Sequence, residues 1–530
     1  MKRFRKWMHK EPEYPTIPED YHSEDEESPR LTLDLEQNEL IFRRIFHNSS
    51  DIVFRKIGMA EQALWLVIFL ESLVDEQIVD EHILKPLISN TSKQQEFDTQ
   101  AEELDDQIIS AASTNLSSNV TDIVRHVLKG HAIVLTRADS NAMMVKVNGN
   151  KQRSLEEPSS EPVIRGPRDG FIENISTNIG LIRSRLKSSR LKMESITIGE
   201  LSQTEVILTY IVGIASESLI EEVRKRVSRI QIDGILDSAY IEEFIEDSPY
   251  SPFPLLHSTE RPDVVAAELL EGKVAILVDT SPFALIAPMT FWTGLQASED
   301  YYVRWPIATF VRWVRFLFTA IAIFAPPLYV AVTTFHQEMI PTNLVLSLAS
   351  SREAVPFPAL IEALLMEIIF EALREAGIRL PKQIGQAVSI VGALVIGQAA
   401  VEAGIISAPV VIIVSITGIA AFTIPRYSFA NGIRLLRFPM LFLAGTLGLY
   451  GIVLGFLGIL LHVAMLRSFG VPYFTPVAPL TLASLKDVII RAPIWAKTGR
   501  PHATGMSNPV REPAGQKPGP SQGKQPSENN

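Results

Sequence analysis

The sequence has no cysteine among its 530 residues. This absence excludes disulfide bonds, zinc sites built on thiolates and cysteine nucleophiles, and it fits a chain whose water-exposed part stays in the cytoplasm. The basic N-terminus, which includes Lys2, Arg5 and Lys10, has no apolar run behind it. It is therefore not a secretory signal peptide, and we expect later segments to direct insertion into a membrane.

Catalytic signatures are also missing. The first half of the chain has no phosphate loop, no dinucleotide-binding glycine pattern, no HExxH, no GxSxG and no EF-hand. The arginines around Arg224 follow Glu217 and Glu221 at spacings that suit ion pairs within one helix, which argues against nucleic-acid binding. We predict a protein that is not an enzyme, with no catalytic residue, no metal site, no cofactor and no nucleic-acid partner.

Charge is scarce in residues 386–425, where Glu402 is the only charged side chain. About 40 apolar residues are enough for two membrane spans of roughly 20 residues each. The net charge of −11 lies mainly in the more polar first half of the chain. We therefore predict a water-exposed N-terminal part and a membrane-embedded C-terminal part.

The two polar side chains of the first of these spans lie on the same face of the predicted helix as two valines. On a helix, Val391, Val395, Gln398 and Glu402 fall within an arc of roughly 60°. A carboxylate and an amide inside a span are costly against lipid, so they should face other helices or water. One interpretation is helix packing with Glu402 at an interfacial end. The other is a pore-lining helix.

The fold class predicted for the whole chain is an α/β N-terminal region of two subdomains, followed by an all-α polytopic membrane domain. Residues 1–34 are expected to be a disordered tail. Alternating and amphipathic patterns then predict two related α/β subdomains, and the C-terminus is rich in Pro, Gly, Ser, Gln and Asn. The predicted boundaries are 35–150 and 151–280 for the subdomains, 281–480 for the membrane domain and 481–530 for the C-terminal region and tail.

Four to five spans are predicted in the membrane domain, at about 316–335, 358–377, 386–403, 405–425 and 438–461. The preceding segment, from about 281, is short, apolar and broken by proline, so we expect it to be re-entrant or interfacial. Pro326 and Pro327 stand in the middle of the first span. They free backbone carbonyl groups and form a candidate hinge.

The helix predicted at 358–377 carries several acidic residues, with Glu367 and Glu371 on one arc and Glu362 on the opposite side. An interfacial amphipathic helix with a solvated acidic face would explain this pattern. An acidic lining that concentrates cations at a pore mouth would explain it as well.

Basic residues suggest the orientation of the spans. Arg312 and Arg315 precede the first predicted span beside several aromatic residues, and Arg426, Arg434 and Arg437 form a basic loop, so both groups are expected in the cytoplasm. With the helix at 358–377 crossing, the basic residues near the C-terminus, such as Lys486, would lie on the opposite side unless residues 471–480 re-enter.

Several motifs resemble one known family, the A subunits of the nutrient germinant receptors of endospore-forming bacteria. They are PFALIAPMTFWTGLQASEDYY, PFPALIEALLMEIIFEALREAGIRLP, VGALVIGQAAVEAG and LLHVAMLRSFGVPY, together with NSSDIVFRKI near the start. The resemblance covers residues 38–501. A related family, the channel-like stage V sporulation membrane proteins, has the same architecture and is the alternative within this group.

The resemblance implies a multi-pass protein of the spore inner membrane, with its N-terminal domain in the cytoplasm or spore core. It further implies a permease-like B subunit and a C-subunit lipoprotein as partners, contact with membrane lipid, and assembly into a homo-oligomer that conducts monovalent cations when nutrient is sensed. Membership of this family would make the chain a subunit that triggers spore germination.

Two functions of different classes follow. The first is a subunit of a nutrient-gated cation channel, in which Val391 and Val395 form an apolar constriction and Gln398 and Glu402 offer oxygen ligands. The second is a non-conducting scaffold that couples a separate sensor to other membrane partners. A conductance measurement would separate them.

Overall fold

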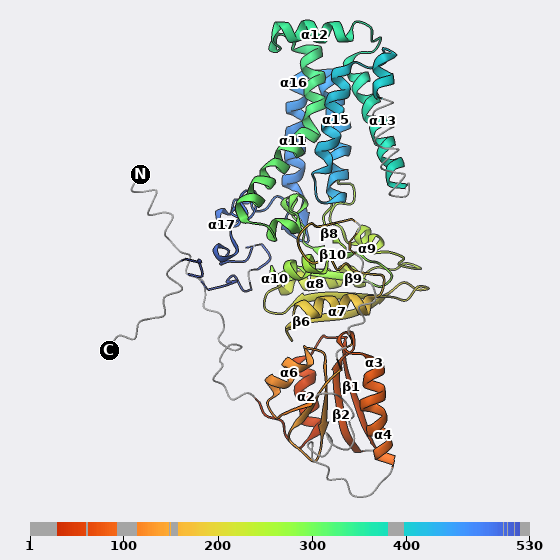
Figure 1. Cartoon of the computed structure of the whole chain (residues 1–530), viewed down its shortest axis with the longest axis vertical. Helices are drawn as coiled ribbons and strands as arrows, with labels where there is room; N and C mark the ends of the chain where they lie inside the picture. Colours follow the sequence, from red (N-terminus) through yellow and green to blue (C-terminus); the bar gives the residue numbers. More distant parts are fainter. Residues whose placement is uncertain are drawn as a thin grey trace, which may run out of the picture.

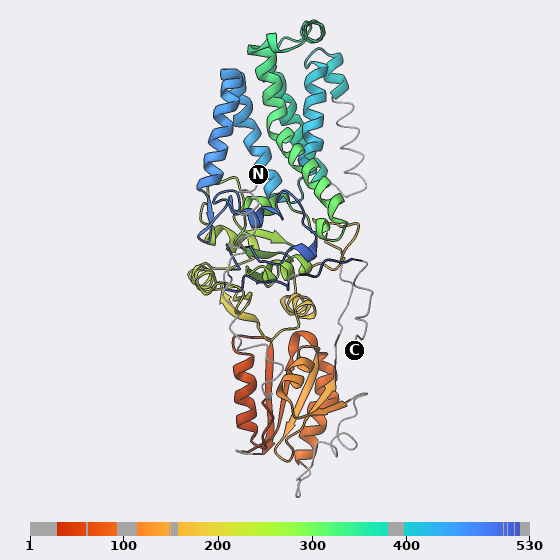
Figure 2. The same cartoon turned by 90° about the vertical axis from the view of Figure 1, so that its left-hand side faces the viewer.

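The computed structural model describes residues 29–59, 62–92, 114–147, 149, 157–158, 160–379, 397–501, 503–505, 507–513 and 515–519. The described part is an elongated stack of three bodies: a first α/β subdomain, a second α/β subdomain and a helix bundle (Figure 1). The view turned by 90° shows the same order along the long axis (Figure 2).

The first subdomain contains one five-stranded sheet in the order β1-β2-β4-β5-β3, and every neighbouring pair is antiparallel. Its strands are β1 (Ile52–Met59), β2 (Gln62–Leu70), β3 (Thr114–Ser117), β4 (His131–Thr136) and β5 (Ala142–Lys146). The helices are α2 (Leu35–Ile45), η2 (Glu71–Leu73), α3 (Glu76–Val79), η3 (Asp80–Leu84), α4 (Lys85–Ser92) and α6 (Val120–Val127). Trp65, Val67 and Phe69 bury against one helical layer, while Leu66 and Ile68 bury against the other. After Gln62, strand β2 is apolar because helices cover both of its faces.

The second subdomain repeats this arrangement with the strand order β6-β7-β9-β10-β8, again antiparallel throughout. Its strands are β6 (Leu191–Ile198), β7 (Thr204–Ile211), β8 (His257–Thr259), β9 (Val274–Val278) and β10 (Ala284–Ala287). Helices α8 (Glu217–Ser228) and α9 (Ser238–Ile245) cover one face, and α7 (Ile175–Arg185) and α10 (Pro262–Leu270) cover the other.

The two subdomains share a local signature as well as a strand order. Buried Asn38 in α2 accepts a hydrogen bond from the Thr32 N–H (3.0 Å) and donates to the Thr32 carbonyl (2.6 Å). Asn178 in α7 makes the same pair of bonds with Ile172, at 2.9 and 2.6 Å. In each subdomain a buried amide thus fixes the chain that enters the first helix. The α/β prediction for this region is confirmed, although its sheets are antiparallel.

The structure corrects one prediction, that the segment from about residue 281 is re-entrant or interfacial. Residues 284–287 form β10, which pairs with β9 and β8 inside the second sheet, so the α/β region extends past residue 280. The alternation of Leu285 and Ala287 toward one core and Ala284 and Ile286 toward the other is that of a central strand. A four-residue apolar strand resembles an interfacial segment in sequence because both are short and apolar.

The helix bundle consists of α11 (Trp305–Phe335), α13 (Ala359–Arg379), α15 (Ala408–Phe422) and α16 (Tyr427–Met465). Short helix α12 (Thr342–Arg352) lies across the end farthest from the α/β subdomains (Figures 1 and 2). Within the described residues, α11 and α16 are long and apolar enough to cross a membrane, and α15 is a shorter apolar helix. This is fewer than the four to five spans expected, and most of the predicted span 386–403 lies outside the described residues.

Helix α16 reverses direction in the middle, at Gly448, whose φ is +64° and ψ is −142°. The two halves run side by side, because a Cβ on Gly455 would meet the sulfur of Met440 and a Cβ on Gly451 would meet the Leu443 carbonyl. Figure 2 shows this helical hairpin. The predicted span 438–461 is therefore wrong as a single crossing, since its chain turns back at residue 448.

Because of this hairpin, the C-terminal segment returns to the second subdomain. It contains β11 (Arg467–Ser468), β12 (Val471–Pro472), α17 (Leu482–Leu485) and η7 (Ile494–Ala496). Arg500 Nε donates to the Leu270 carbonyl (2.9 Å), and Thr504 Oγ1 donates to the Glu271 carbonyl (2.7 Å). The basic residues near the C-terminus thus lie on the same side of the bundle as the α/β region.

Candidate functional site

Inside the bundle, the acidic residues of α13 are tied to arginines. Glu367 forms an ion pair with Arg437 of α16, and both side chains are almost fully buried. Arg437 also donates from Nε to the carbonyl of Ala322 in α11 (2.9 Å). One guanidinium therefore joins three helices at a single buried point.

The Ala322 carbonyl is the one that Pro326 leaves without a helical partner. In an α-helix the N–H of residue i donates to the carbonyl of residue i−4, and proline has no N–H. Helix α11 continues through Pro326 and Pro327, and both prolines are buried. Arg437 supplies the missing donor, so the candidate hinge and the acidic helix, which sequence reasoning treated separately, meet at one polar contact.

Glu362 has a different role at the far end of the bundle. Its Oε2 accepts from the backbone N–H of Ser407 (2.9 Å), and its Oε1 lies 3.3 Å from Arg352 Nε. Ser407 is the N-cap of α15, so the carboxylate sits where the helix dipole favours a negative charge. Glu362 connects α12, α13 and α15. It is a buried capping group, which explains the position of a lone carboxylate among apolar neighbours.

Glu371, the third acidic residue, lies near the base of the bundle. Arg374 of the same helix contacts its Oε2 at 2.9 Å, while Arg434 of α16 is 4.0 Å away. Glu362 and Glu367 are fully buried and Glu371 is mostly so. The solvated acidic face that the sequence allowed is therefore absent from these three described residues.

The predicted pore stripe is described only in part. Val391 and Val395 lie outside the described residues. Gln398 and Glu402 are described, and the Gln398 amide donates to the Glu402 carboxylate (2.8 Å) on an exposed surface. Their shared face follows from the i, i+4 spacing on a helix. The pore-lining role of the four residues stays a prediction.

A buried charge cluster connects the base of α11 to the segment that precedes it and to the C-terminal segment. Asp300, in η5 (Ser298–Tyr301), lies 2.9 Å from Arg312 Nε and 3.1 Å from Arg315 Nη1. Asp487 of the C-terminal segment contacts Arg312 at 3.4 Å and accepts from the Tyr301 hydroxyl at 2.9 Å. Both guanidinium groups are buried against these carboxylates. The cytoplasmic side expected for Arg312 and Arg315 stays a prediction.

A second polar link joins the start of α16 to the chain between the subdomains. Arg426 forms an ion pair with Glu161, which also accepts from the Thr259 hydroxyl (2.8 Å). Burial alone would raise the pKa of Glu161, but the charge of Arg426 holds that pKa below its ordinary value. The pair is therefore ionised at neutral pH and fastens the bundle to the second subdomain.

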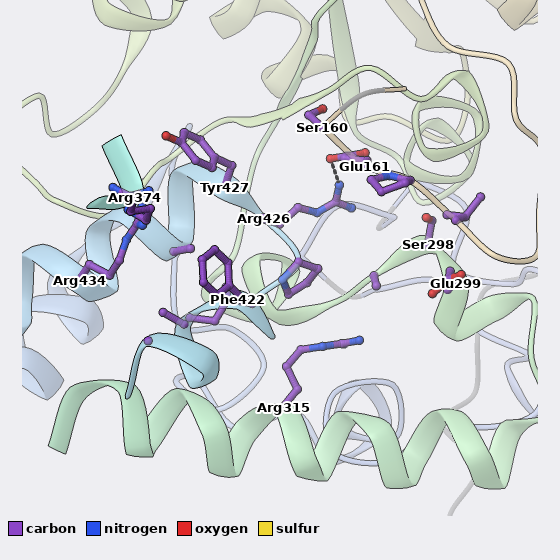
Figure 3. Close-up of a pocket in the computed structure, with 18 of the residues that line it drawn as sticks. Ser160, Glu161, Ser298, Glu299, Arg315, Arg374, Phe422, Arg426, Tyr427 and Arg434 are labelled. Atoms are coloured by element: carbon purple, nitrogen blue, oxygen red, sulfur yellow. Dashed lines mark hydrogen bonds and ion pairs between the residues drawn. The ribbon is translucent and has the colours of Figure 1, made fainter. Parts of the chain in front are cut away.

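Between these two links lies a cavity of about 470 Å³ (Figure 3). Its walls come from the base of α11, α13, α15 and α16, and from the loops of the second subdomain. Four arginines line it: Arg315, Arg374, Arg426 and Arg434. Among the described residues no group of three acidic or histidine side chains is arranged to hold a metal ion.

Sequence reasoning missed Asp300, Asp487 and the partners of Arg437. The signal available was the excess of arginine in apolar helices, because a buried arginine requires a carboxylate or a free carbonyl. Spacing along the chain could not identify the partner, since Glu367 and Arg437 are 70 residues apart.

A family model described as Bacillus/Clostridium GerA spore germination protein matches residues 41–503. The chain belongs to the GerA family. This GerA-family chain is 46% identical to the uncharacterized membrane protein YfkQ of Bacillus subtilis, over 92% of this chain and 94% of the relative. It is 44% identical to spore germination protein KA of B. subtilis, over 89% and 87%, and 40% identical to spore germination protein A1 of the same organism, over 85% and 92%.

One solved structure is also similar to this GerA-family chain. It is the N-terminal domain of the A subunit of the Bacillus megaterium spore germinant receptor GerK3, at 33% sequence identity, with a TM-score of 0.39 and coverage of 50% of this chain and 98% of that chain.

Proposed function

We propose that this GerA-family chain is the A subunit of a nutrient germinant receptor and forms the ion path of a nutrient-gated cation channel in the spore inner membrane. The observation that carries the proposal is the three-helix contact at Arg437. It places an arginine on the carbonyl freed by Pro326 and on Glu367 at once. Such a contact can hold α11 in one shape while the guanidinium is in place and allow a second shape when it leaves, because Pro326 has no N–H that could donate to that carbonyl instead.

The charge cluster at the base of α11 supplies the input to this contact. Asp300 lies in the segment that joins the second subdomain to α11, and it contacts Arg312 and Arg315 in the lower part of α11. A shift of that subdomain would therefore move the lower part of α11, and the proline pair is the point at which the helix can bend. The α/β region transmits and does not catalyse in this proposal.

The proposed path is lined by Val391, Val395, Gln398 and Glu402 from several copies of the chain. Homo-oligomerisation is part of the proposal because one helix cannot enclose a pore. The permease-like B subunit would sense nutrient, the C-subunit lipoprotein would complete the complex, and monovalent cations would be conducted. The match to the GerA spore germination family and the relatives titled spore germination proteins support this assignment.

A non-conducting scaffold is the second candidate, and one observation favours it. Glu362, Glu367 and Glu371 are all engaged by arginine, so α13 offers no free acidic lining to attract cations. In the channel proposal this attraction rests on Glu402, which among described residues contacts only the neutral Gln398 amide.

The proposal is tested by measuring cation flux from liposomes that contain the purified full chain together with its partner subunits. We expect flux when nutrient is added. The Glu402→Gln variant keeps the size and polarity of the side chain but removes its charge, so we expect it to reduce both the flux and the selectivity. Glu375→Gln, an exposed change on α13, is the control. Absence of flux from a receptor that still triggers germination would favour the scaffold, and normal flux from Glu402→Gln would remove the electrostatic role.

A further inference from the structure

The cavity at the base of the bundle holds a positive charge that the described residues do not neutralise. Arg374 and Arg434 lie side by side at one end of the cavity (Figure 3), and Arg374 contacts Glu371 at 2.9 Å. Arg434 remains 4.0 Å from that carboxylate. Two guanidinium groups thus share one carboxylate, which leaves a surplus of one positive charge at this end of the cavity.

Arg434 is also poor in hydrogen bonds. It is only 7% exposed, and its Nε and Nη2 have no partner among the described residues. A buried guanidinium with two unsatisfied N–H groups is costly, because its hydration is lost and nothing replaces it. The Arg434 side chain lines the cavity, so an anion there could balance the charge and accept from its N–H groups.

The acidic side chains that line the cavity do not supply this anion. Glu161 is engaged by Arg426, and Glu299 lies at the opposite end of the cavity from Arg434 (Figure 3). Asp300 pairs with Arg315, the fourth arginine of the lining. The uncompensated charge is therefore local to Arg374 and Arg434.

Beside the two arginines the lining is apolar and leads to an apolar outer surface. Phe370, Ala421 and Phe422 border the cavity beside the two arginines. Phe422 is 71% exposed and Ile419, one turn earlier in α15, is 63% exposed. An arginine pair at the edge of a membrane bundle, beside an exposed apolar helix face, matches an anionic headgroup with its acyl chains along that face.

We propose that this cavity binds the phosphate of an anionic phospholipid, with Arg434 and Arg374 as its ligands. A phosphodiester carries one negative charge, which equals the local surplus. Its oxygens accept from guanidinium N–H groups in the geometry that arginine favours. The proposal is independent of whether the chain conducts ions.

The test measures the thermal unfolding midpoint of the full chain in detergent with added phosphatidylglycerol, with phosphatidylcholine, and with inorganic phosphate. We expect phosphatidylglycerol to raise the midpoint more than either of the others, and native mass spectrometry to show retained anionic lipid. Equal shifts with the two lipids would overturn the proposal. A full shift with inorganic phosphate alone would replace the lipid by a free anion and would overturn it as well.

Arg434→Gln should abolish the difference between the two lipids. Without lipid it should unfold at the same or a higher temperature than the wild type, because it removes an unpartnered buried charge. Arg374→Gln leaves Arg434 and Glu371 as a one-to-one pair, so it should also abolish the difference between the two lipids. This variant replaces the first one in the test if Arg434→Gln does not fold. Arg379→Gln is the matched control, since that side chain is on the same helix and 77% exposed. Retention of the lipid difference in both cavity variants would show that the arginines are not its ligands.

Discussion

At the scale of single residues, Arg437 shows how a membrane bundle can carry buried charge. Its side chain is fully buried, yet it has both a carboxylate and a carbonyl as acceptors. The pair does not stabilise merely by being ionic, since desolvation offsets most of the attraction between buried charges. Its effect is specificity, because only one relative placement of α11, α13 and α16 satisfies all three groups.

Replacing Arg437 with methionine should destabilise the chain by about 3–5 kcal/mol, the cost of leaving one partner of a buried pair uncompensated. The Ala322 carbonyl also loses its donor. The double variant Arg437→Met with Glu367→Gln should recover part of the loss, because the remaining carboxyl group is replaced by a neutral amide. Thermal unfolding in detergent compares the two, and equal midpoints would show that the pair does not couple.

We expect the stability of the chain to depend on pH through two glutamates at α9, which lies outside the bundle. Burial, followed by repulsion from neighbouring carboxylates, raises the pKa of Glu242 to about 7, and the same causes raise the pKa of Glu246 to about 7. A pKa that is raised on folding means that the folded state binds more protons between about pH 4.5 and 7. Stability from these groups is therefore present at acidic pH and lost as the pH rises through 7.

Glu242→Gln should accordingly raise the unfolding midpoint at pH 8 and have little effect at pH 5, where the carboxyl group of the wild type is protonated. Midpoints of the full chain measured at both pH values test this. Glu221→Gln, an exposed change on α8, should show no such difference between the two. A constant effect of Glu242→Gln across the range would contradict the raised pKa.

At the scale of elements, α11 and α16 both depart from the regular hydrogen-bond pattern of a helix and do so by different means. Helix α11 keeps its course through two prolines because another helix supplies a donor, whereas α16 turns back at a glycine in a conformation that other residues avoid. The arrangement in α11 can be reversed, because Arg437 can leave the Ala322 carbonyl. The turn in α16 is fixed, because it depends on the backbone conformation of Gly448.

Pro326→Ala tests the first departure. The new N–H can donate to the Ala322 carbonyl and would displace Arg437 from it. We expect normal abundance by immunoblot but a weak germination response to nutrient. Pro306→Ala, in the first turn of the same helix where no N–H is needed, is the control. A normal response of Pro326→Ala at normal abundance would remove the hinge from the mechanism.

Gly448→Ala tests the second departure. A Cβ at this position would meet the side chains of His336 and Phe335 at 2.9 and 3.1 Å, and the positive φ is unfavourable for alanine. The expected loss is about 1–3 kcal/mol of stability. At Gly458, in the returning half of α16, a Cβ would meet nothing within 4 Å, so alanine should be neutral or stabilising by about 0.5–1 kcal/mol. Similar midpoints for the two variants would argue against the reversal at residue 448.

At the scale of the whole molecule, the hairpin decides on which side the C-terminus lies. Sequence reasoning left the basic residues near Lys486 on the opposite side from the α/β region unless a later segment re-entered. The structure returns the chain at Gly448 instead, and the C-terminal segment contacts Asp300's neighbour Tyr301 through Arg491 (3.2 Å to the carbonyl).

The absence of natural cysteine makes this arrangement directly testable. Single cysteines at Ser350 and Tyr450 mark the far end of the bundle, and a cysteine at Lys486 marks the end beside the α/β subdomains. A maleimide that does not cross membranes should label the first two from one side of sealed vesicles and the third only from the other. Labelling of all three from the same side would contradict the hairpin.

Much of the α/β region could be predicted because its strands and helices are long and periodic, as in β7 and α8. Strands β8 and β10 were missed because three or four residues carry too little pattern. The reversal at Gly448 was missed because Gly445, Gly451, Gly455 and Gly458 stand in the same apolar run, and sequence does not tell which glycine has a positive φ. Ion partners were missed because the fold, not the spacing, brings α13 to α16.

The bundle is joined at three separate points to the second subdomain and to the chain on either side of it. Asp300 contacts the start of α11, Glu161 contacts Arg426 before α16, and Ser251 lies within hydrogen-bond distance (3.0 Å) of His462 near the end of α16. Three attachments restrain rotation of the lower bundle against the subdomain more than a single one would. We therefore expect a movement of the subdomain to carry the lower bundle with it, and the bend to occur higher up, at Pro326.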